Sequence, residues 1–219
     1  MKNAELLSPA GDLECIDAAL HFGADAVYAG GRIMQLRAAK AAMSDAALKE
    51  AVRRVHEKGK RIYITLNCFA ENSDIEKAGE YARELYEIGV DAVIVSDIGV
   101  LAEIKRKVPE IEVHVSTQAN CMNYMAARVY YDMGAKRVIL ARELSIESIA
   151  ELRAKTPKDL QLEAFVHGAM CMSYSGRCLI SSFLTGRSGN KGECAQPCRW
   201  QYALVEKKRP DQSFDIEEE

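Results

Sequence analysis

The 219-residue sequence has no long hydrophobic run and little net charge. No stretch approaches the roughly 20 apolar residues that a membrane-spanning helix needs, so we expect no membrane insertion. The first five residues, Met1 to Glu5, contain no hydrophobic signal region, and we therefore expect a cytoplasmic protein. A formal charge of -3 provides no overall positive field that would indicate a nucleic-acid partner.

Several motifs of familiar enzyme classes are also missing. No strand-like segment is followed by Gly-x-Gly-x-x-Gly, and Ala29-Gly30-Gly31 is only a weak imitation of that dinucleotide-binding motif. Neither His-Glu-x-x-His nor Gly-x-Ser-x-Gly occurs, so two common peptidase signatures are absent. The histidines are scattered over separate parts of the chain: His21, His56, His114 and His167.

A repeated pattern of a glycine followed by a short hydrophobic segment is present instead. Gly23–Tyr28 reads Gly-Ala-Asp-Ala-Val-Tyr and returns as Gly89–Ile94 and Gly134–Ile139, with a looser copy at Gly59–Ile64. Each glycine suits the left-handed position at the end of an amphipathic helix. Each continuous hydrophobic run suits a parallel strand that is buried on both faces. The pattern therefore predicts repeated β/α units.

Seven such units can be placed along the chain. The expected strands are Leu6–Pro9, Ala26–Ala29, Arg61–Leu66, Ala92–Ser96, Glu112–Ser116, Arg137–Ala141 and Gln161–Val166. Between them we expect helices, one opened by a capping box at Ser73–Glu76 and another capped by Ser145. This spacing predicts an α/β fold, a (β/α)8 TIM-like barrel of about seven visible units, with an open doubly wound sheet as the alternative. Tyr202–Glu206 is hydrophobic enough for an eighth strand, but no helix follows it.

Polar residues follow the expected strands at the end where TIM barrels carry their catalytic groups. Gln118, Arg142, Glu143 and His167 stand at such positions and are not usual helix-capping residues. We therefore predict that they form the catalytic site. Asp97 also follows a strand, but we interpret it as a helix cap.

Four of the seven cysteines fall close together, separated by six, fifteen and three residues. They are Cys171, Cys178, Cys194 and Cys198. The chain between them is rich in glycine and serine, and clustered thiolates in such a loop favour a soft metal, either iron–sulfur or zinc. The spacing is not that of a zinc ribbon, so we favour iron–sulfur. For the remaining cysteines we expect buried free thiols on barrel elements: Cys15, Cys68 and Cys121.

The cysteine-rich part of the chain is also locally basic. Between positions 161 and 209 there are seven Lys or Arg residues against three acidic ones. Cations can neutralise phosphates, and an aromatic ring can stack on an unpaired base. We predict that the following residues bind RNA: Arg177, Arg187, Lys191, Arg199 and Trp200. A solvated loop surface is the alternative.

Several segments resemble a known family. Glu163–Ser181, which contains His167-Gly-Ala-Met-Cys171 and Gly176-Arg-Cys178, resembles the signature of the U32 family, historically called collagenase-like peptidases. Gly192–Trp200 resembles the branch of prephenate-dependent tRNA uridine 5-hydroxylases. The segments Val115–Asn120 and Leu140–Ser145 resemble the same branch.

The resemblance implies a barrel with a 4Fe–4S cluster. It also implies oxygen-independent hydroxylation at C5 of the wobble uridine in the tRNA anticodon loop, with prephenate as co-substrate. Cys171, Cys178 and Cys194 match cluster ligands of the family. The fourth ligand is either Cys198 or a cysteine in the longer sequence of family members.

Two departures from the family pattern are visible. Members continue well past the end of this chain, so we expect a truncated or split protein, with a partner chain supplying the C-terminal part. The segment Arg37–Ser44 also lacks the Asn-Phe expected before its capping residue, which weakens substrate contacts there.

The expected organisation is therefore barrel units at 1–168, a cluster-binding segment at 169–209, and an acidic tail at 210–219. Two alternative functions stay open. One is a U32-type peptidase that uses a Cys/His pair, since His167 lies four residues before Cys171. The other is a non-catalytic iron–sulfur scaffold.

Overall fold

The computed structural model describes residues 4–36, 42–168 and 171–214, and strands and helices alternate through residues 7–163. The strands of this part are β1 (Leu7–Pro9), β2 (Ala26–Gly30), β3 (Arg61–Leu66), β4 (Ala92–Val95), β5 (Glu112–Val115), β6 (Arg137–Ile139) and β7 (Gln161–Glu163). The helices are α1 (Leu13–His21), α2 (Asp45–Glu57), α3 (Asn72–Ile88), α4 (Ile98–Lys107), α5 (Tyr124–Asp132) and α6 (Ile146–Ala154).

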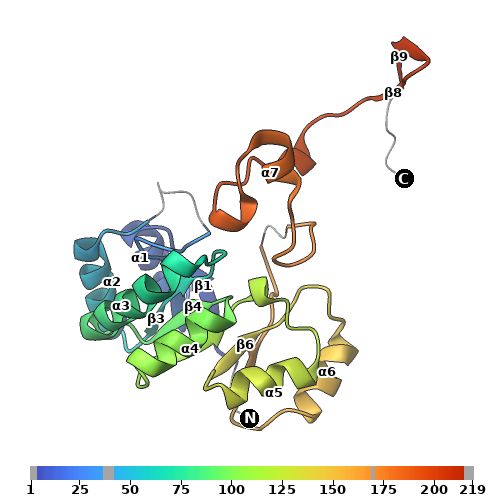
Figure 1. Ribbon diagram of the computed structural model, residues 1–219. Helices are drawn as coiled ribbons and strands as arrows, with labels where there is room; N and C mark the ends of the chain where they lie inside the picture. The colour runs from blue at the N-terminus through green and yellow to red at the C-terminus, as the bar shows by residue number, and fades with distance from the viewer. Residues whose placement is uncertain (1–3, 37–41, 169–170, 215–219) are drawn as a thin grey trace.

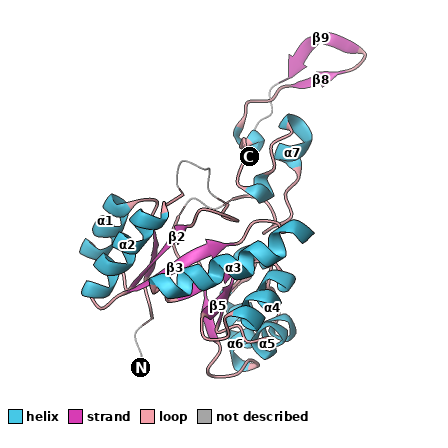
Figure 2. Cartoon of the chain, turned by 60° about the vertical axis from the view of Figure 1, so that its left-hand side comes forward, coloured by secondary structure: helices cyan, strands magenta, loops and turns pink. Residues whose placement is uncertain are grey.

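The seven strands form one parallel sheet in the order β1-β2-β3-β4-β5-β6-β7, so each strand pairs with its neighbours in sequence. The helices lie on the outer side of this curled sheet (Figures 1 and 2). Among the described residues β7 does not pair with β1, and the result is a partial TIM-like barrel. The predicted barrel of seven units is confirmed. The doubly wound alternative is wrong, because the strand order contains no reversal.

The outer face of the sheet and the inner faces of the helices make the hydrophobic core. Ile62, Ile64 and Leu66 alternate along β3 toward the helices and are fully buried. Leu48 and Val55 of α2 join the same core, on the helix face that the sequence pattern predicts. Full burial of one such side chain contributes about 1.5–3 kcal/mol, so this face accounts for the folding of the repeated units.

The barrel interior is more polar than the continuous hydrophobic runs suggest. Arg137 on β6 is buried, and its Nη1 lies 2.7 Å from a Glu5 oxygen and 3.1 Å from a Glu163 oxygen. Its guanidinium lies 5.2 Å from the ring centre of Tyr63, whose hydroxyl donates to Glu5 at 3.0 Å. The predicted burial of the strands on both faces is confirmed, as along β4, but the inner face combines this charged group with a small hydrophobic cluster that includes Ile94 and Ile139. These charges tolerate burial because they are paired.

Capping residues set the ends of several helices as predicted. Gly89 and Gly134 have φ values of 97° and 96°, the left-handed conformation that follows a helix at low cost only in glycine. The Ser145 hydroxyl accepts the Ser148 N–H and caps α6, and Asp97 caps α4. Of the segment Arg37–Ser44, residues 37–41 lie outside the described residues, whereas Ser44 caps α2.

The start of α3 differs from the prediction. Glu71, not Ser73, is the N-cap, and the capping box joins Glu71 and Asp74. The Glu71 N–H donates to a carboxylate oxygen of Asp74 at 2.9 Å. Because this pair satisfies the first free N–H groups, the helix begins earlier and Ser73 falls within its first turn.

Beyond β7 the chain leaves the barrel. It forms the short helix α7 (Ile180–Thr185), the 3-10 turns η3 (Gly189–Lys191) and η4 (Pro197–Arg199), and the strands β8 (Leu204–Glu206) and β9 (Arg209–Phe214). Tyr202–Glu206, the segment hydrophobic enough for an eighth strand, does not join the barrel, because β8 pairs antiparallel with β9 in a separate hairpin. The hairpin projects away from the barrel (Figure 1). We call residues 171–200 the cysteine segment.

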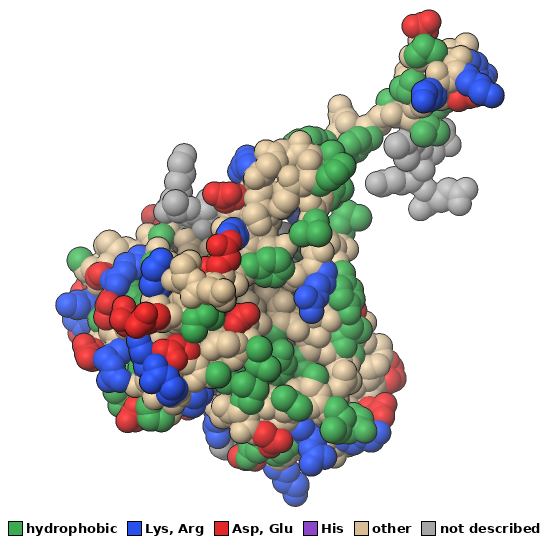
Figure 3. Space-filling view, in the orientation of Figure 1, with side chains coloured by type: hydrophobic (Ala, Val, Ile, Leu, Met, Phe, Trp, Pro, Cys, Tyr) green, Lys and Arg blue, Asp and Glu red, His purple; other side chains and the backbone are tan. Residues whose placement is uncertain are grey.

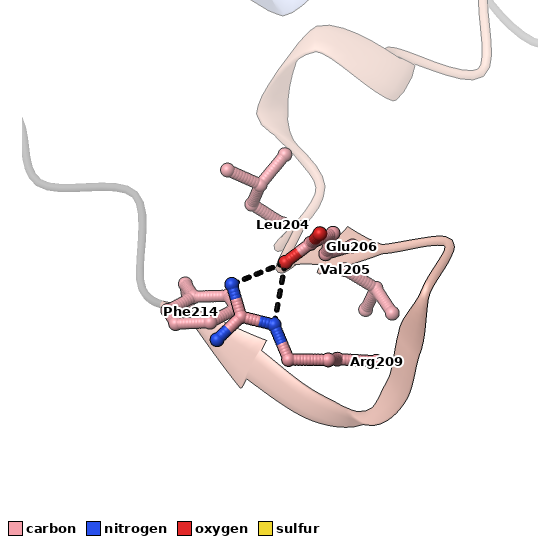
Figure 4. Close-up of a pocket in the computed structure, with 5 residues that line it drawn as sticks. All are labelled: Leu204, Val205, Glu206, Arg209 and Phe214. Carbon is pink, nitrogen blue, oxygen red and sulfur yellow. Dashed lines mark hydrogen bonds and ion pairs between the residues drawn. The ribbon is translucent and has the colours of Figure 1, made fainter.

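The hairpin encloses a small hollow of its own. Leu204, Val205, Glu206, Arg209 and Phe214 line it, and the Glu206 carboxylate pairs with the Arg209 guanidinium (Figure 4). None of the predicted site residues lines this hollow. No described helix is long and apolar enough to cross a membrane.

Candidate functional site

The C-terminal ends of the central strands form a polar edge. Asn67, directly after β3, donates through Nδ2 to the Ser116 hydroxyl at 3.1 Å. The Ser96 hydroxyl, after β4, donates to the Asn67 carbonyl at 2.9 Å. Ser116 also accepts the Gln118 N–H at 3.2 Å and so starts the turn η2 (Thr117–Ala119). Hydrogen bonds thus join three neighbouring strand ends into one platform.

The cysteine segment lies against this edge through Arg142, which follows β6. Arg142 Nη1 donates to the Cys171 carbonyl at 2.5 Å, and Nη2 donates to the Ser173 carbonyl at 3.0 Å. The Nε and Nη2 groups also lie 3.3 and 3.2 Å from the Ser175 hydroxyl oxygen. One guanidinium therefore holds three successive points of the loop that begins with Cys171.

Glu143 binds the same loop from the adjacent position. Its carboxylate accepts the Ser175 backbone N–H at 2.9 Å and the Ser175 hydroxyl at 3.3 Å. Partial burial works against ionisation of Glu143, but the Ser175 bonds and the nearby Arg142 charge outweigh it and lower the pKa of the carboxyl group. Ser175 itself is fully buried. It is thus one point at which the cysteine segment is fixed to the barrel.

Gly176 brings the loop against the turn after β5. Its φ is 71°, and a Cβ atom added there would lie 2.1 Å from the Gln118 carbonyl oxygen. Only glycine fits this approach. The predicted site residues Gln118, Arg142 and Glu143 therefore do come together, around Ser175 and Gly176.

A second contact fixes the middle of the cysteine segment to the loop between β3 and α3. The Asn190 side chain donates to the Cys178 carbonyl at 2.7 Å, and the Asn190 carbonyl accepts the Phe69 N–H at 2.9 Å. Lys191 next to it forms an ion pair with Glu71. Asn190 is buried, so this contact links Cys178 firmly to the barrel.

The four clustered cysteines are free thiols. Cys171, Cys194 and Cys198 are exposed and Cys178 is partly buried. Within residues 4–36, 42–168 and 171–214, no three Cys, His, Asp or Glu side chains come together as a ready-made metal site. The Gln196 N–H donates to Cys194 Sγ at 3.3 Å, the kind of backbone bond that stabilises a thiolate ligand.

The packing of the cysteine segment fits a group held by these thiols. Apart from Pro197, its buried side chains are polar, namely Ser175, Ser181 and Asn190. By contrast Phe183 and Met172 are 87% and 81% exposed, and hydrophobic side chains lie on the surface around α7 (Figure 3). A segment with so little apolar core gains stability from a bound metal or cluster. The donor chemistry and the packing agree, although the thiols are not preassembled.

The other three cysteines differ from one another. Cys121 is buried, and burial raises the pKa of its thiol to about 11. Burial likewise raises the pKa of the Cys68 thiol. Cys15 lies exposed on α1, so the expectation of a buried thiol is wrong there, because this position faces outward on the helix. Within the described chain, none of the three joins the clustered cysteines in a metal site.

His167 and the predicted RNA-binding residues stand at the surface. His167 is exposed and, in the part of the chain described, has no hydrogen bond to a cysteine or carboxylate. All five predicted RNA contacts are exposed, namely Arg177, Arg187, Lys191, Arg199 and Trp200. Lys191 differs from the rest because Glu71 already balances its charge.

Sequence reasoning missed Ser175 and Asn190, the two residues that fix the cysteine segment. Both sit among glycines and serines, and that composition suggested a flexible loop. The close backbone approach of Gly176, next to Ser175, is visible only in the structure. No sequence signal marks either residue.

Comparison with known proteins identifies the family. The chain matches peptidase family U32 over residues 11–219. It belongs to that family. Because the match covers nearly the whole chain, the resemblance inferred from the cysteine-rich motifs is confirmed.

Relatives of this U32 chain carry different names. It is 43% identical over 212 residues to the tRNA hydroxylation protein P of Helicobacter pylori strain J99, covering 96% of this chain and 50% of the relative. The 23S rRNA 5-hydroxycytidine C2501 synthase of Escherichia coli is 41% identical over 91% of this chain and 30% of its own length. A collagenase of Porphyromonas gingivalis is 32% identical over 93% of the chain and 51% of its own length.

The chain spans about half the length of the tRNA hydroxylation proteins that it matches. Among solved structures, a U32 peptidase superimposes with a TM-score of 0.63 at 13% identity, covering 74% of this chain and 68% of that one. At this identity the likeness concerns the fold alone, and it agrees with the partial barrel.

Proposed function

We propose that this U32 chain is the barrel part of an RNA-hydroxylating enzyme that adds a hydroxyl group at C5 of the tRNA wobble uridine without molecular oxygen. The observation that carries the proposal is the docking of the cysteine segment on the C-terminal edge of the barrel, where TIM barrels hold their substrates. The names of the relatives, two of which concern RNA hydroxylation, support the reaction class.

A 4Fe–4S cluster is the proposed cofactor, with Cys171, Cys178 and Cys194 as ligands and Cys198 or a cysteine outside this chain as the fourth. Such a cluster would supply one-electron chemistry at the barrel edge. The chain's own contribution is to place these thiols. Two of them belong to loops fixed to the barrel, Cys171 through Arg142 and Cys178 through Asn190.

The RNA substrate is proposed to bind over the cysteine segment. Arg177, Arg187 and Arg199 are exposed there, and within the described chain no carboxylate pairs with any of them. Trp200 is about half exposed and can stack on an unpaired base. A wobble base already lies in a single-stranded loop, so little free energy is needed to present it at the barrel edge.

Prephenate is the proposed co-substrate, bound at the same edge. Gln118 and His167 remain predicted contacts for it, because their side chains stay available. Arg142 fits this role poorly, since all three of its guanidinium nitrogens already donate hydrogen bonds within the chain.

The test begins with anaerobic purification, an absorption spectrum, and iron and sulfide assays. The purified protein is then incubated without oxygen with unmodified tRNA, with and without prephenate, and the nucleosides are analysed by mass spectrometry. We expect iron, sulfide and a uridine that gains one oxygen atom only when prephenate is present. A colourless protein that binds zinc would contradict the proposal. Iron without any modified uridine would favour the scaffold alternative.

The peptidase alternative rests on the names of the family and of its collagenase relative. A Cys/His pair would have to come from His167 and Cys171, but in the described part of the molecule no hydrogen bond joins them. Hydrolysis of gelatin by the metal-free protein, lost in Cys171→Ala, would favour this alternative.

A further inference from the structure

All three guanidinium nitrogens of Arg142 donate hydrogen bonds within the chain. Its Nη1 reaches the Cys171 carbonyl, its Nη2 reaches the Ser173 carbonyl, and its Nε and Nη2 reach the Ser175 hydroxyl, over distances of 2.5–3.3 Å. A substrate carboxylate needs two parallel N–H groups from one side of the guanidinium. The two possible pairs are Nε with Nη2 and Nη1 with Nη2. In both pairs the nitrogens already donate hydrogen bonds to the loop. Paired binding of a carboxylate would therefore require the loop to leave.

Glu143 completes a closed set of contacts with Ser175. The buried Ser175 hydroxyl lies within hydrogen-bond distance of Arg142 and of Glu143, while its backbone N–H binds Glu143. The cation and the anion thus meet at one buried hydroxyl and balance each other there. Two adjacent residues in the loop after β6 fix a loop about 30 residues further along the chain.

From this geometry we propose that Arg142 and Glu143 are positioning residues, which hold the Cys171–Ser175 loop on the barrel edge and thereby set the place of Cys171. Arg142 acts through two backbone carbonyls and the Ser175 hydroxyl, Glu143 acts through the Ser175 N–H and the same hydroxyl, and neither touches substrate. The consequence for metal binding rests on the proposed function, but the fixing of the loop does not. Rigid support of a ligand-bearing loop favours tight metal binding because less order has to be gained when the metal arrives.

The experiment measures hydrogen exchange of the metal-free protein by mass spectrometry. The variants are Arg142→Lys, Arg142→Ala and Glu143→Gln, and the control is Arg187→Ala, an exposed arginine of the same segment. Arg142→Lys keeps the charge, but one ammonium group cannot reach three acceptors at once. Glu143→Gln keeps one acceptor for the Ser175 N–H and loses the charge.

We expect the amides of residues 173–177 to exchange at least about tenfold faster in both Arg142 variants, since charge-assisted hydrogen bonds are lost. Glu143→Gln should give a smaller increase, and Arg187→Ala none. Exchange in β3 and β4 should stay unchanged in every variant, which separates loss of the contact from unfolding. Unchanged exchange at 173–177 in Arg142→Ala, or full protection in Arg142→Lys, overturns the proposal.

A second measurement tests whether loss of the Arg142 contacts weakens iron binding at Cys171. After anaerobic reconstitution, iron loss to a chelator is followed by absorbance. We expect about tenfold faster loss in Arg142→Lys and Arg142→Ala than in wild type or Arg187→Ala. If wild type takes up no iron, the proposed function fails, while the exchange data still decide the fate of the positioning role. Faster exchange with unchanged iron loss would overturn the link to Cys171.

Discussion

The barrel and the cysteine segment are stabilised in opposite ways. In the barrel the fully buried side chains are mostly hydrophobic, as along β3 with Ile62, Ile64 and Leu66. In the cysteine segment the buried side chains apart from Pro197 are polar, while Phe183 is 87% exposed. Burial of apolar surface provides a large and non-directional stabilisation, whereas hydrogen bonds fix positions with a small net gain. The barrel therefore supplies the stability, and the segment depends on point contacts with it.

The largest effect is expected on the free energy of unfolding. Removing one large side chain from each region tests the contrast. Leu66→Ala should lower the free energy of unfolding by about 2–5 kcal/mol, because it leaves a cavity in the core. Phe183→Ala should change it by less than about 0.5 kcal/mol, because the ring is already in water. Urea unfolding followed by circular dichroism measures both. Similar losses in the two variants would mean that the cysteine segment has a hydrophobic core after all.

Removal of one clustered thiol should affect the cysteine segment and leave the barrel unchanged. Cys178→Ala should lose most of the bound iron, because the variant lacks one proposed ligand. Hydrogen exchange should then accelerate in the cysteine segment and not in the barrel, since the proposed metal contacts only the segment. Cys15→Ala, which removes an exposed thiol on α1, is the control and should keep its iron. An iron content equal to wild type in Cys178→Ala would remove Cys178 from the ligand set.

Acid should act on the barrel through Glu112 on β5. The ring of His114, 3.6 Å away, and the guanidinium of Arg61 at 2.8 Å hold the pKa of Glu112 at about 2, below its ordinary value of 4.5. A lowered carboxyl pKa stabilises the fold above pH 4.5, and that contribution disappears as the pH falls toward 2. Between pH 4.5 and 2 the free energy of unfolding should therefore fall more in wild type than in Glu112→Gln.

Urea midpoints at several pH values measure the difference. Glu87→Gln, at an exposed position of α3, is the matched control and should follow the wild-type curve. Parallel curves for wild type and Glu112→Gln would show that the Glu112 pairing contributes nothing to acid stability.

The smallest effect concerns RNA. Arg187→Ala should weaken tRNA binding several-fold and reduce the slope of log Kd against log salt by about 1, since one phosphate contact is lost. Lys191→Ala should do less, because Glu71 already engages that ammonium group. Titrations of labelled tRNA at several salt concentrations compare the two variants. Equal and unchanged affinities would place the RNA surface outside this part of the segment.

Much of the barrel could be predicted from the sequence because its signals are local. At Gly89 and Gly134 a glycine follows an amphipathic helix and precedes a hydrophobic run. Both glycines adopt the predicted left-handed conformation after their helices. The inner face could not be predicted in the same way. Arg137 pairs with Glu5, 132 positions away, and no local pattern records such a distant partner.

The candidate site was only partly predictable for the same reason. That Arg142 and Glu143 follow a strand could be inferred from the strand pattern, and so could their place at the C-terminal edge. Their partner could not, because Ser175 is one serine among many in a loop of unremarkable composition. For Tyr202–Glu206 the composition suits a strand, but composition does not say which strand it pairs with, and so the sequence left its place in the fold open.

The ion pair between Glu5 and Arg137 has a consequence for the order in which the protein takes shape during synthesis. Each strand from β1 to β7 pairs with the strand made just before it, so the sheet can grow unit by unit as the chain leaves the ribosome. Glu5, by contrast, must wait until β6 has emerged before its carboxylate finds Arg137. Until then the Glu5 carboxylate lacks its cationic partner, and nascent chains shorter than about 137 residues should be more open to proteases at their first strand.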